Sequence, residues 1–342
     1  MKHIYWFAYF NSDLPSVRYR ADYPLEELRE KHGITYSIVY PSYDLKSILH
    51  FLQVYFACLF FRKEDSVIVI QKLYTNGLYA HALKLLVFMR RQNTLYDLDD
   101  AEYLEYPPVA INYFMKRCAA CSMGSAALVE YAKQFNSNSF FLTSPVIEHN
   151  QVKKERSPVF TIGWIGCYGG AHKDALFTQA FPAIKKVDFP IRLVLLGVKK
   201  QTHKEELRNF FGENKNIELV IPGNINWHDE TSIYKRIKSF DLGLAPLLDI
   251  EMHRAKSAFK LKQYFSCGVP VLGSDIGENG RFLENGVNGF LCRTPEHYQE
   301  MIVKIKNMKK ELYETISCNA RNSAEKFTLK GYCSALMEFY RN

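Results

Sequence analysis

The residues best suited to chemistry lie between Arg254 and Asn279, where cations precede one predicted helix and a glycine-containing loop precedes the next. Arg254, Lys256 and Lys260 fall within seven residues, and the loop at 277–279 carries glycine, glutamate and asparagine. Fixed cations and the N–H groups of a helix N-terminus both attract anions. This spacing predicts a site that holds a diphosphate group.

The same stretch predicts the elements that position these groups. Four apolar residues between Phe259 and Phe265 recur at roughly helical spacing, and Gly268 ends that helix just before a proline. Residues 269–273 predict a short buried strand. Gly277 begins a loop that opens the following helix.

A group of carboxylates follows another predicted strand. Asp97, Asp99 and Asp100 lie at the end of the strand expected at 93–98. They could act on a ligand, or one of them could cap the next helix. A metal site is less favoured, because no other ligand is anchored nearby in the sequence.

Composition limits the class of protein. A chain of 342 residues is most simply two domains, and 47% hydrophobic with 23% charged residues is ordinary for a soluble globular protein. There is no run of about 18 apolar residues, as a membrane-spanning helix would need. The opening MKHIYWFAYF has no small-residue cleavage site, so we expect no signal peptide and a cytoplasmic location.

The eight cysteines are scattered, and only Cys118 and Cys121 form a CxxC pair. A structural zinc site usually needs two such pairs or histidines at matched spacing. We therefore favour thiols buried in the core over a metal or redox role.

The net charge of +8 is spread over basic pairs along the chain, and a solvated surface explains most of them. Attraction to an anionic membrane face and binding of nucleic acid are the two functional alternatives. No nucleic-acid module signature is present, so the membrane is favoured. The apolar helix expected at 45–61, followed by Arg62 and Lys63, is favoured as a core helix over a membrane-facing amphipathic surface.

Strand-like and helix-like stretches alternate in two series. The first includes SVIVIQ at 66–71, which predicts a strand buried on both faces. The alternation breaks at 144–158 and restarts with a strand at 159–165. We therefore expect an α/β protein of two doubly wound domains, 1–150 and 151–327, with ligands in the cleft between them. The C-terminal helix at 328–342 could pack back on the first domain.

Two stretches resemble the GT-B fold retaining glycosyltransferases, the group 1 or family 4-like enzymes of bacterial polysaccharide, capsule and lipopolysaccharide biosynthesis. They are FDLGLAPL at 240–247 and RAKSAFKLKQYFSCGVPVLGSDIGENGRFLENGVNGFL at 254–291. Weaker similarity lies in SVRYR at 16–20, in YDLDDAEY at 96–103 and in residues 120–145. Most of the chain is covered, with the C-terminal half the more diagnostic.

The resemblance implies two Rossmann-like domains that face each other across a cleft. It also implies transfer of a sugar from a nucleotide-diphosphate sugar to a glycan or lipid-linked acceptor, with retention and without a metal or cofactor. The acceptor side would be the first domain, and peripheral contact with the inner face of the plasma membrane is one option. In a metal-free site, cations and N–H dipoles must stabilise the departing diphosphate.

Site residues follow from the same resemblance. The donor would contact Gly166, Cys167, Lys173, Arg254, Lys256, Lys260, Gln263, Gly277 and Asn279. Catalytic roles would fall to Asp99, Asp100 and Glu278. The alternatives are ordinary ones: a strand–helix turn at 166–173, a solvated helix start at 256–260 and a tight turn at 277. Residues 16–20, including Arg18 and Arg20, would contact acceptor or phosphate, or pair on the surface with Asp22 or Glu26.

The chain departs from the family pattern at two positions. Many members carry two glutamates eight residues apart, where this chain has Ala255 and Gln263. An amide at Gln263 can still bond ribose hydroxyls, whereas Ala255 cannot replace a carboxylate. Asp99 stands where members often place a histidine. A sugar-nucleotide epimerase, a phosphorylase and a degenerate nucleotide-sugar-binding module therefore remain as alternatives.

Overall fold

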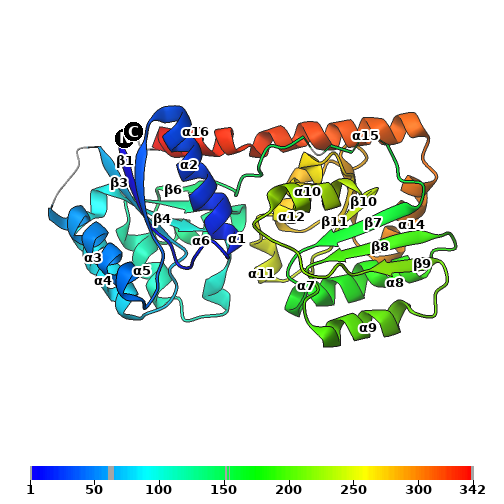
Figure 1. The fold of residues 1–342 in the computed structure, drawn as a ribbon, viewed down its shortest axis with the longest axis horizontal. Helices are drawn as coiled ribbons and strands as arrows, with labels where there is room; N and C mark the ends of the chain where they lie inside the picture. Colours follow the sequence, from blue (N-terminus) through cyan, green and yellow to red (C-terminus); the bar gives the residue numbers. More distant parts are fainter. Residues whose placement is uncertain (1, 61–64, 151, 154, 340–342) are drawn as a thin grey trace. The chain divides into compact units, whose positions relative to one another are not determined.

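The computed structural model describes residues 2–60, 65–150, 152–153 and 155–339. The chain folds into two compact units (Figure 1). Unit 1 comprises Met1–Pro145, Ala255–Ser257 and Phe327–Asn342, and unit 2 comprises Val146–Arg254 and Ala258–Lys326. The main boundary between the units thus falls at residues 145–146, a few residues before the expected boundary at 150–151. The segment 255–257 belongs to unit 1 rather than to the C-terminal domain.

Unit 1 is built on a six-stranded, wholly parallel sheet in the order β2-β1-β3-β4-β5-β6. The strands are β1 His3–Phe7, β2 Thr35–Val39, β3 Ser66–Gln71, β4 Thr94–Leu98, β5 Ala120–Met123 and β6 Ser139–Phe141. Every residue of β3 is buried, as its run of β-branched residues predicts. The sequence did not predict β5 or β6, because ACSM and SFF are short and the first lacks β-branched residues.

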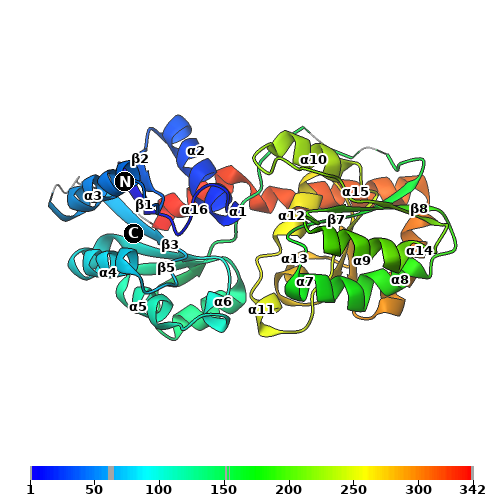
Figure 2. The same ribbon diagram turned by 60° about the horizontal axis from the view of Figure 1, so that its bottom comes forward.

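Helices cover both faces of this sheet. They are α1 Pro15–Val17, α2 Tyr23–His32, α3 Leu45–Phe60, α4 Leu78–Arg90, α5 Val109–Arg117, α6 Ala126–Lys133 and α16 Leu329–Phe339. Side chains of α3 to α6 pack with Tyr5, Ile68 and Tyr96 on one face, while α2 and α16 pack with Trp6 and Val69 on the other. The C-terminal helix α16 contacts α2 directly (Figure 2).

Unit 2 repeats the plan with a second parallel sheet in the order β12-β11-β10-β7-β8-β9. Its strands are β7 Phe160–Ile165, β8 Ile191–Leu196, β9 Ile217–Val220, β10 Leu242–Ala245, β11 Val271–Ser274 and β12 Gly289–Cys292. Its helices are α7 Gly170–Ala175, α8 Phe181–Lys185, α9 Gln201–Phe211, α10 Glu230–Lys238, α11 Glu251–Arg254, α12 Phe259–Ser266, α13 Gly277–Phe282, α14 Pro295–Lys306 and α15 Lys310–Ser323.

Two glycines let aromatic rings lie against the second sheet. Gly163 on β7 and Gly243 on β10 are direct neighbours across the two strands. A Cβ at Gly163 would meet the ring of Phe240 at 2.0 Å, and one at Gly243 would meet the ring of Tyr264 at 2.7 Å. The Tyr264 ring therefore packs on bare backbone, which fixes α12 against the ends of β7 and β10.

The helix predicted from the apolar spacing at 259–265 is confirmed as α12. Gly268 follows it with φ +67°, and the N–H groups of Gly268 and Val269 donate to carbonyls of Phe265 and Tyr264. This is the left-handed C-terminal cap that glycine supplies.

Among the described residues, no helix is long and apolar enough to cross a membrane. Six of the cysteines are buried: Cys58, Cys118, Cys121, Cys267, Cys292 and Cys333. The prediction of core thiols is confirmed for these six, and it is wrong for Cys167 and Cys318, which are exposed.

Candidate functional site

The predicted phosphate-binding residues of unit 2 gather at the carboxyl ends of β7, β10 and β11. The hydroxyl of Tyr264 holds this edge together, because it accepts from the N–H of Ile165 at 3.1 Å and donates to the carbonyl of Leu244 at 3.1 Å. One side chain of α12 thus ties together the ends of two neighbouring strands. The first turn of α12 is thereby placed beside the loop that follows β7.

Lys260 lies directly over the backbone of Gly166. A Cβ at residue 166 would stand 2.5 Å from Cε and 3.2 Å from Nζ of Lys260. The ammonium also lies 5.6 Å from the ring centroid of Trp164. Gly166 has φ +154°, so both its backbone and the space around it favour glycine. Lys260 and Gly166, 94 positions apart in the sequence, therefore place an ammonium group directly beside bare backbone at the end of β7.

A second glycine, at the end of β8, packs against Gly166. Gly197 has φ +110°, and a Cβ there would stand 1.9 Å from the carbonyl oxygen of Gly166. Sequence analysis did not select Gly197. Its only signal is its place directly after the apolar strand at 192–196, where a turn is common.

The loop after β11 is held close to α11. Gly277 has φ +53°, and a Cβ there would meet the carbonyl oxygen of Arg254 at 2.6 Å. Asn279 donates from Nδ2 to the carbonyl of Ala245 at 2.8 Å, and Glu278 accepts from Nη1 of Arg281 at 3.0 Å with each oxygen. The backbone at 277 and the end of β10 are therefore fixed relative to each other.

Glu278 and Asn279 are almost fully buried, whereas Arg254 is exposed and pairs with Asp249 at 2.7 Å. Burial of Glu278 and Asn279 gives them a structural role in unit 2 whatever else they contact.

A polar network that the sequence did not reveal supports the same edge. Ser274, the last residue of β11, accepts from the N–H of Leu247 at 2.9 Å and donates to Oε1 of Gln179 at 2.6 Å. Gln179 returns a bond from Nε2 to the carbonyl of Leu247 at 2.8 Å. Nearby, the rings of His172 and His253 stack with centroids 5.2 Å apart. These bonds tie the start of the loop from β10 to α11 to the end of β11.

The other predicted donor residues lie in different surroundings. Lys173 forms an ion pair with Glu206 at 2.6 Å and lies 5.5 Å from the ring centroid of Phe177. Cys167 is exposed, and Gln263 is buried within α12. A ligand would have to displace Glu206 to gain the full charge of Lys173.

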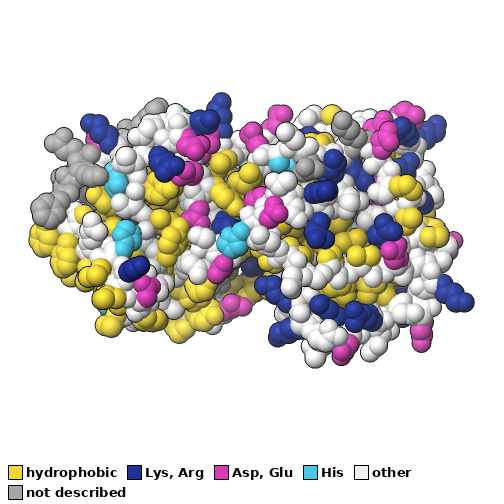
Figure 3. All heavy atoms as spheres, viewed as in Figure 1, with side chains coloured by type: hydrophobic (Ala, Val, Ile, Leu, Met, Phe, Trp, Pro, Cys, Tyr) yellow, Lys and Arg dark blue, Asp and Glu magenta, His cyan; other side chains and the backbone are white. Residues whose placement is uncertain are grey.

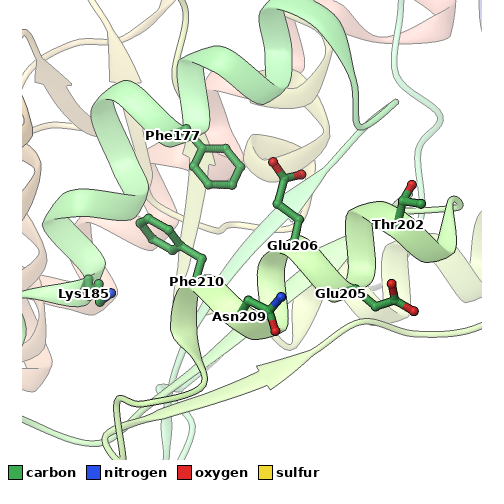
Figure 4. A pocket seen from close by; sticks show the side chains of 7 residues that line it. All are labelled: Phe177, Lys185, Thr202, Glu205, Glu206, Asn209 and Phe210. Carbon is green, nitrogen blue, oxygen red and sulfur yellow. The ribbon is translucent and has the colours of Figure 1, made fainter.

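Glu206 also borders an open hollow of about 680 Å³ on unit 2. Phe177 and Phe210 point into it from neighbouring helices (Figure 4). None of the residues predicted to bind the donor or to act in catalysis lines this hollow. We therefore place the candidate site at the strand ends and not in the hollow.

Unit 1 contains a separate charged cluster at the ends of β3 and β4. Lys72, which has φ +52°, places its ammonium 3.2 Å from Asp99, 2.8 Å from Asp100 and 2.7 Å from Glu102. Lys256 adds a second ammonium 2.7 Å from Asp100. Asp99 and Asp100 thus come together as expected, and Lys256, which belongs to unit 1, pairs with Asp100.

Burial and the neighbouring lysines shift the pKa values of the carboxyl groups in this cluster in opposite directions. Burial raises the pKa of Glu102 to about 7, against the opposing effect of Lys72. Burial alone would also raise the pKa of Asp100, but Lys72 and Lys256 hold it below the usual range. Asp100 is therefore an anion near neutral pH, whereas Glu102 changes its charge there.

Arg20 and Asp97 form a buried pair and not a ligand contact. Arg20 donates from Nε at 2.8 Å and from Nη2 at 2.5 Å to the two oxygens of Asp97, which also accepts from Ser122 at 2.5 Å. Arg20 is fully buried. The expectation that Arg20 contacts a ligand is wrong, and so is the alternative of surface pairing, because Asp97 and the carbonyl of Leu142 use its donors.

Ala255 is fully buried in the core of unit 1, where a family glutamate would be expected. No group of three or more His, Cys, Asp and Glu side chains among the described residues could hold a metal ion.

Comparison with known proteins agrees with this architecture. Residues 160–310 match the family model described as glycosyl transferases group 1. The chain is similar to Anabaena HepE in complex with UDP, with 16% identity, 99% of both chains covered and a TM-score of 0.67.

Two further solved structures cover the full length. Sucrose-phosphate synthase from Thermosynechococcus elongatus is 9% identical, with a TM-score of 0.69 over 100% of this chain and 98% of that one. A glycosyltransferase from Rickettsia africae is 12% identical, with a TM-score of 0.65 over 99% and 98%. These similarities establish the GT-B fold. No curated protein matches the sequence significantly.

Proposed function

We propose that this chain, which carries a group 1 glycosyl transferase domain at residues 160–310, transfers a sugar from a nucleotide-diphosphate sugar to a glycan or lipid-linked acceptor. The observation that carries the proposal is the Lys260 ammonium over the backbone of Gly166, at the strand ends where ligands of such sheets bind. The matched solved structures of HepE include complexes with UDP and with UDP-glucose, which makes a uridine diphosphate sugar the first donor to test.

The proposed chemistry breaks the bond between the anomeric carbon and the diphosphate oxygen. The acceptor oxygen bonds to the same face of that carbon, and its proton passes to the departing phosphate, so the configuration is retained. Lys260 stabilises the negative charge that develops on the diphosphate. Such fixed positive charge is the reason that we propose a reaction without a divalent metal ion.

Other residues have narrower proposed roles. The N–H group of Gly277 faces the diphosphate, and the bare backbone of Gly166, whose own N–H donates to Leu196, lets the diphosphate approach. Cys167, Arg254 and Asn279 lie beside it. Gln263 bonds the ribose, Glu278 contacts the donor sugar, and Asp99 orients a hydroxyl. Lys173 contributes once it is released from Glu206. Asp100, which already holds Lys72 and Lys256, keeps the charged cluster of unit 1 in place.

We further propose that the enzyme works in the cytoplasm at the inner face of the plasma membrane, in the assembly of a cell-surface polysaccharide or glycolipid. The net charge of +8 supports an anionic surface as its partner.

A thermal-shift screen against UDP, GDP, ADP, CDP and dTDP, with and without EDTA, tests the donor proposal. Ligand at about 100 times its dissociation constant adds roughly 2.7 kcal/mol to the free energy of unfolding. We expect one nucleotide to raise the melting temperature equally in both conditions. A shift abolished by EDTA would contradict metal independence, and no shift with any nucleotide would contradict the donor site.

A nucleotide-sugar-binding module without turnover is the second candidate. The alanine at position 255 favours this candidate, because it offers no carboxylate and its methyl group is buried in the core of unit 1. Nucleotide binding without any slow hydrolysis of the donor would support this candidate over the transferase.

A further inference from the structure

Two neighbouring helices of unit 1 carry large apolar side chains on their outer faces. On α3 these are Leu45, Ile48, Leu49, Leu52, Phe56 and Phe60, and on α4 they are Leu78, Leu85, Phe88 and Met89. Their exposed fractions run from 38% for Leu52 to 90% for Leu78. Figure 3 shows hydrophobic side chains gathered over these helices. We call these ten residues the α3–α4 surface.

The outer residues of α3 follow helical spacing. Leu45, Leu49, Leu52, Phe56 and Phe60 recur at intervals of three or four residues and so share one face. The opposite face is buried in the core of unit 1 through Val54, Tyr55, Cys58 and Leu59. A surface helix of a soluble protein normally has a polar outer face, whereas α3 is apolar on both sides. The prediction of a core helix is confirmed for the inner face of α3, while its apolar outer face is exposed.

Hydrogen bonds hold α3 and α4 side by side. Tyr55 donates to the carbonyl of Ala82 at 3.0 Å. Arg90, the last residue of α4, donates to the carbonyls of Cys58, at 2.9 Å, and Leu59 near the end of α3. Soluble monomers rarely expose continuous apolar patches larger than a few hundred Å² unless the patch contacts a partner.

Charge indicates which partner. Residues 45–60 and 78–93 contain Lys46, Lys84, Arg90 and Arg91 and no acidic residue. Lys46 and Arg91 are exposed beside the surface, while Arg62 and Lys63 lie outside the described residues. An apolar face with neighbouring cations matches acyl chains beneath anionic headgroups. A second copy docked on the same face would instead bring like charges together.

We propose that the α3–α4 surface docks on an anionic lipid bilayer. The side chains of Leu49, Phe56 and Phe88 enter below the headgroups, and Lys46 and Arg91 contact lipid phosphates. The proposal deepens the proposed function, because a lipid-linked acceptor would lie in the same membrane. The docking itself requires no nucleotide.

Co-sedimentation of the full chain with vesicles tests this proposal. We expect binding to phosphatidylcholine vesicles that contain phosphatidylglycerol, and at least tenfold weaker binding to phosphatidylcholine alone. The exposed-site variant Leu49→Gln/Phe56→Gln/Phe88→Gln should lower the partition coefficient by about 1,000-fold, since each large apolar side chain contributes about tenfold. Arg91→Gln should lower it about fivefold, and added salt should weaken binding.

Leu312→Gln is the matched control, because Leu312 is 51% exposed on α15 of unit 2 and should leave vesicle binding unchanged. No binding of the wild-type chain to anionic vesicles, or equal binding of the triple variant, would overturn the proposal. A dimer that the triple variant loses, seen by sedimentation without lipid, would assign the surface to a second copy instead. Nucleotide-induced thermal shifts of the triple variant should equal those of the wild type, so failure of the donor site and failure of docking are told apart.

Discussion

Replacement of Lys260 by methionine should weaken binding of the nucleoside diphosphate without unfolding the protein. The ammonium lies at a half-buried position over Gly166, and methionine keeps most of the apolar stem of the side chain. A charged hydrogen bond to phosphate contributes about 1.5–3 kcal/mol, or roughly 10- to 150-fold in the dissociation constant. Isothermal titration calorimetry with the nucleotide chosen by the thermal-shift screen measures this loss.

Lys256→Met is the matched control, four residues earlier in the same stretch. Lys256 bonds Asp100 in unit 1, so its loss should lower stability while it leaves nucleotide affinity within about twofold. Equal losses of affinity in both variants would refute the assignment of Lys256 to the charged cluster of unit 1 alone. Unchanged affinity in Lys260→Met would refute the placement of the diphosphate.

Three further outcomes follow from the geometry. Gly277→Ala should lower the melting temperature more than Gly286→Ala, because both glycines have positive φ but only Gly277 would place a Cβ 2.6 Å from a backbone oxygen; equal shifts would contradict the close approach. Glu102 has a pKa raised to about 7, so its carboxyl stabilises the fold below the unfolded pKa of 4.5 and loses that contribution as pH rises through 7. Glu102→Gln lacks this dependence. Denaturant titrations should therefore show the variant gaining on the order of 3 kcal/mol relative to the wild type between pH 4.5 and about 8. A pH-independent difference would contradict the raised pKa. Asp97→Asn should cost about 3–5 kcal/mol of unfolding free energy because it leaves Arg20 buried without its partner charge, and a loss below 1 kcal/mol in urea titration would contradict that pairing.

The sequence predicted elements wherever local chemistry decides them. The β-branched run of β3, the apolar spacing of α12 and the left-handed turn at Gly268 each follow from a few adjacent residues. The missed strand β5 has only small residues and methionine, and it is a strand because neighbours on both sides supply its hydrogen bonds. Its burial comes from the fold and not from its own pattern.

The sequence could not predict contacts between residues that are far apart in the chain. Lys256 and Lys260 are neighbours in the chain, yet the segment 255–257 joins unit 1 while Lys260 stays in unit 2. Arg20 finds Asp97 across 77 positions, and no spacing rule connects them. Gly197 meets Gly166 only because β7 and β8 are paired in the sheet.

Release of nucleoside diphosphate from a nucleotide sugar tests the central claim most directly. A coupled assay with UDP-glucose and the other common donors, in EDTA, should show slow hydrolysis to water by the wild-type chain. Lys260→Met should reduce this rate by at least tenfold, while Lys256→Met should retain most of it. Nucleotide binding without any release from any donor would contradict the account and identify a module that binds the donor without turnover.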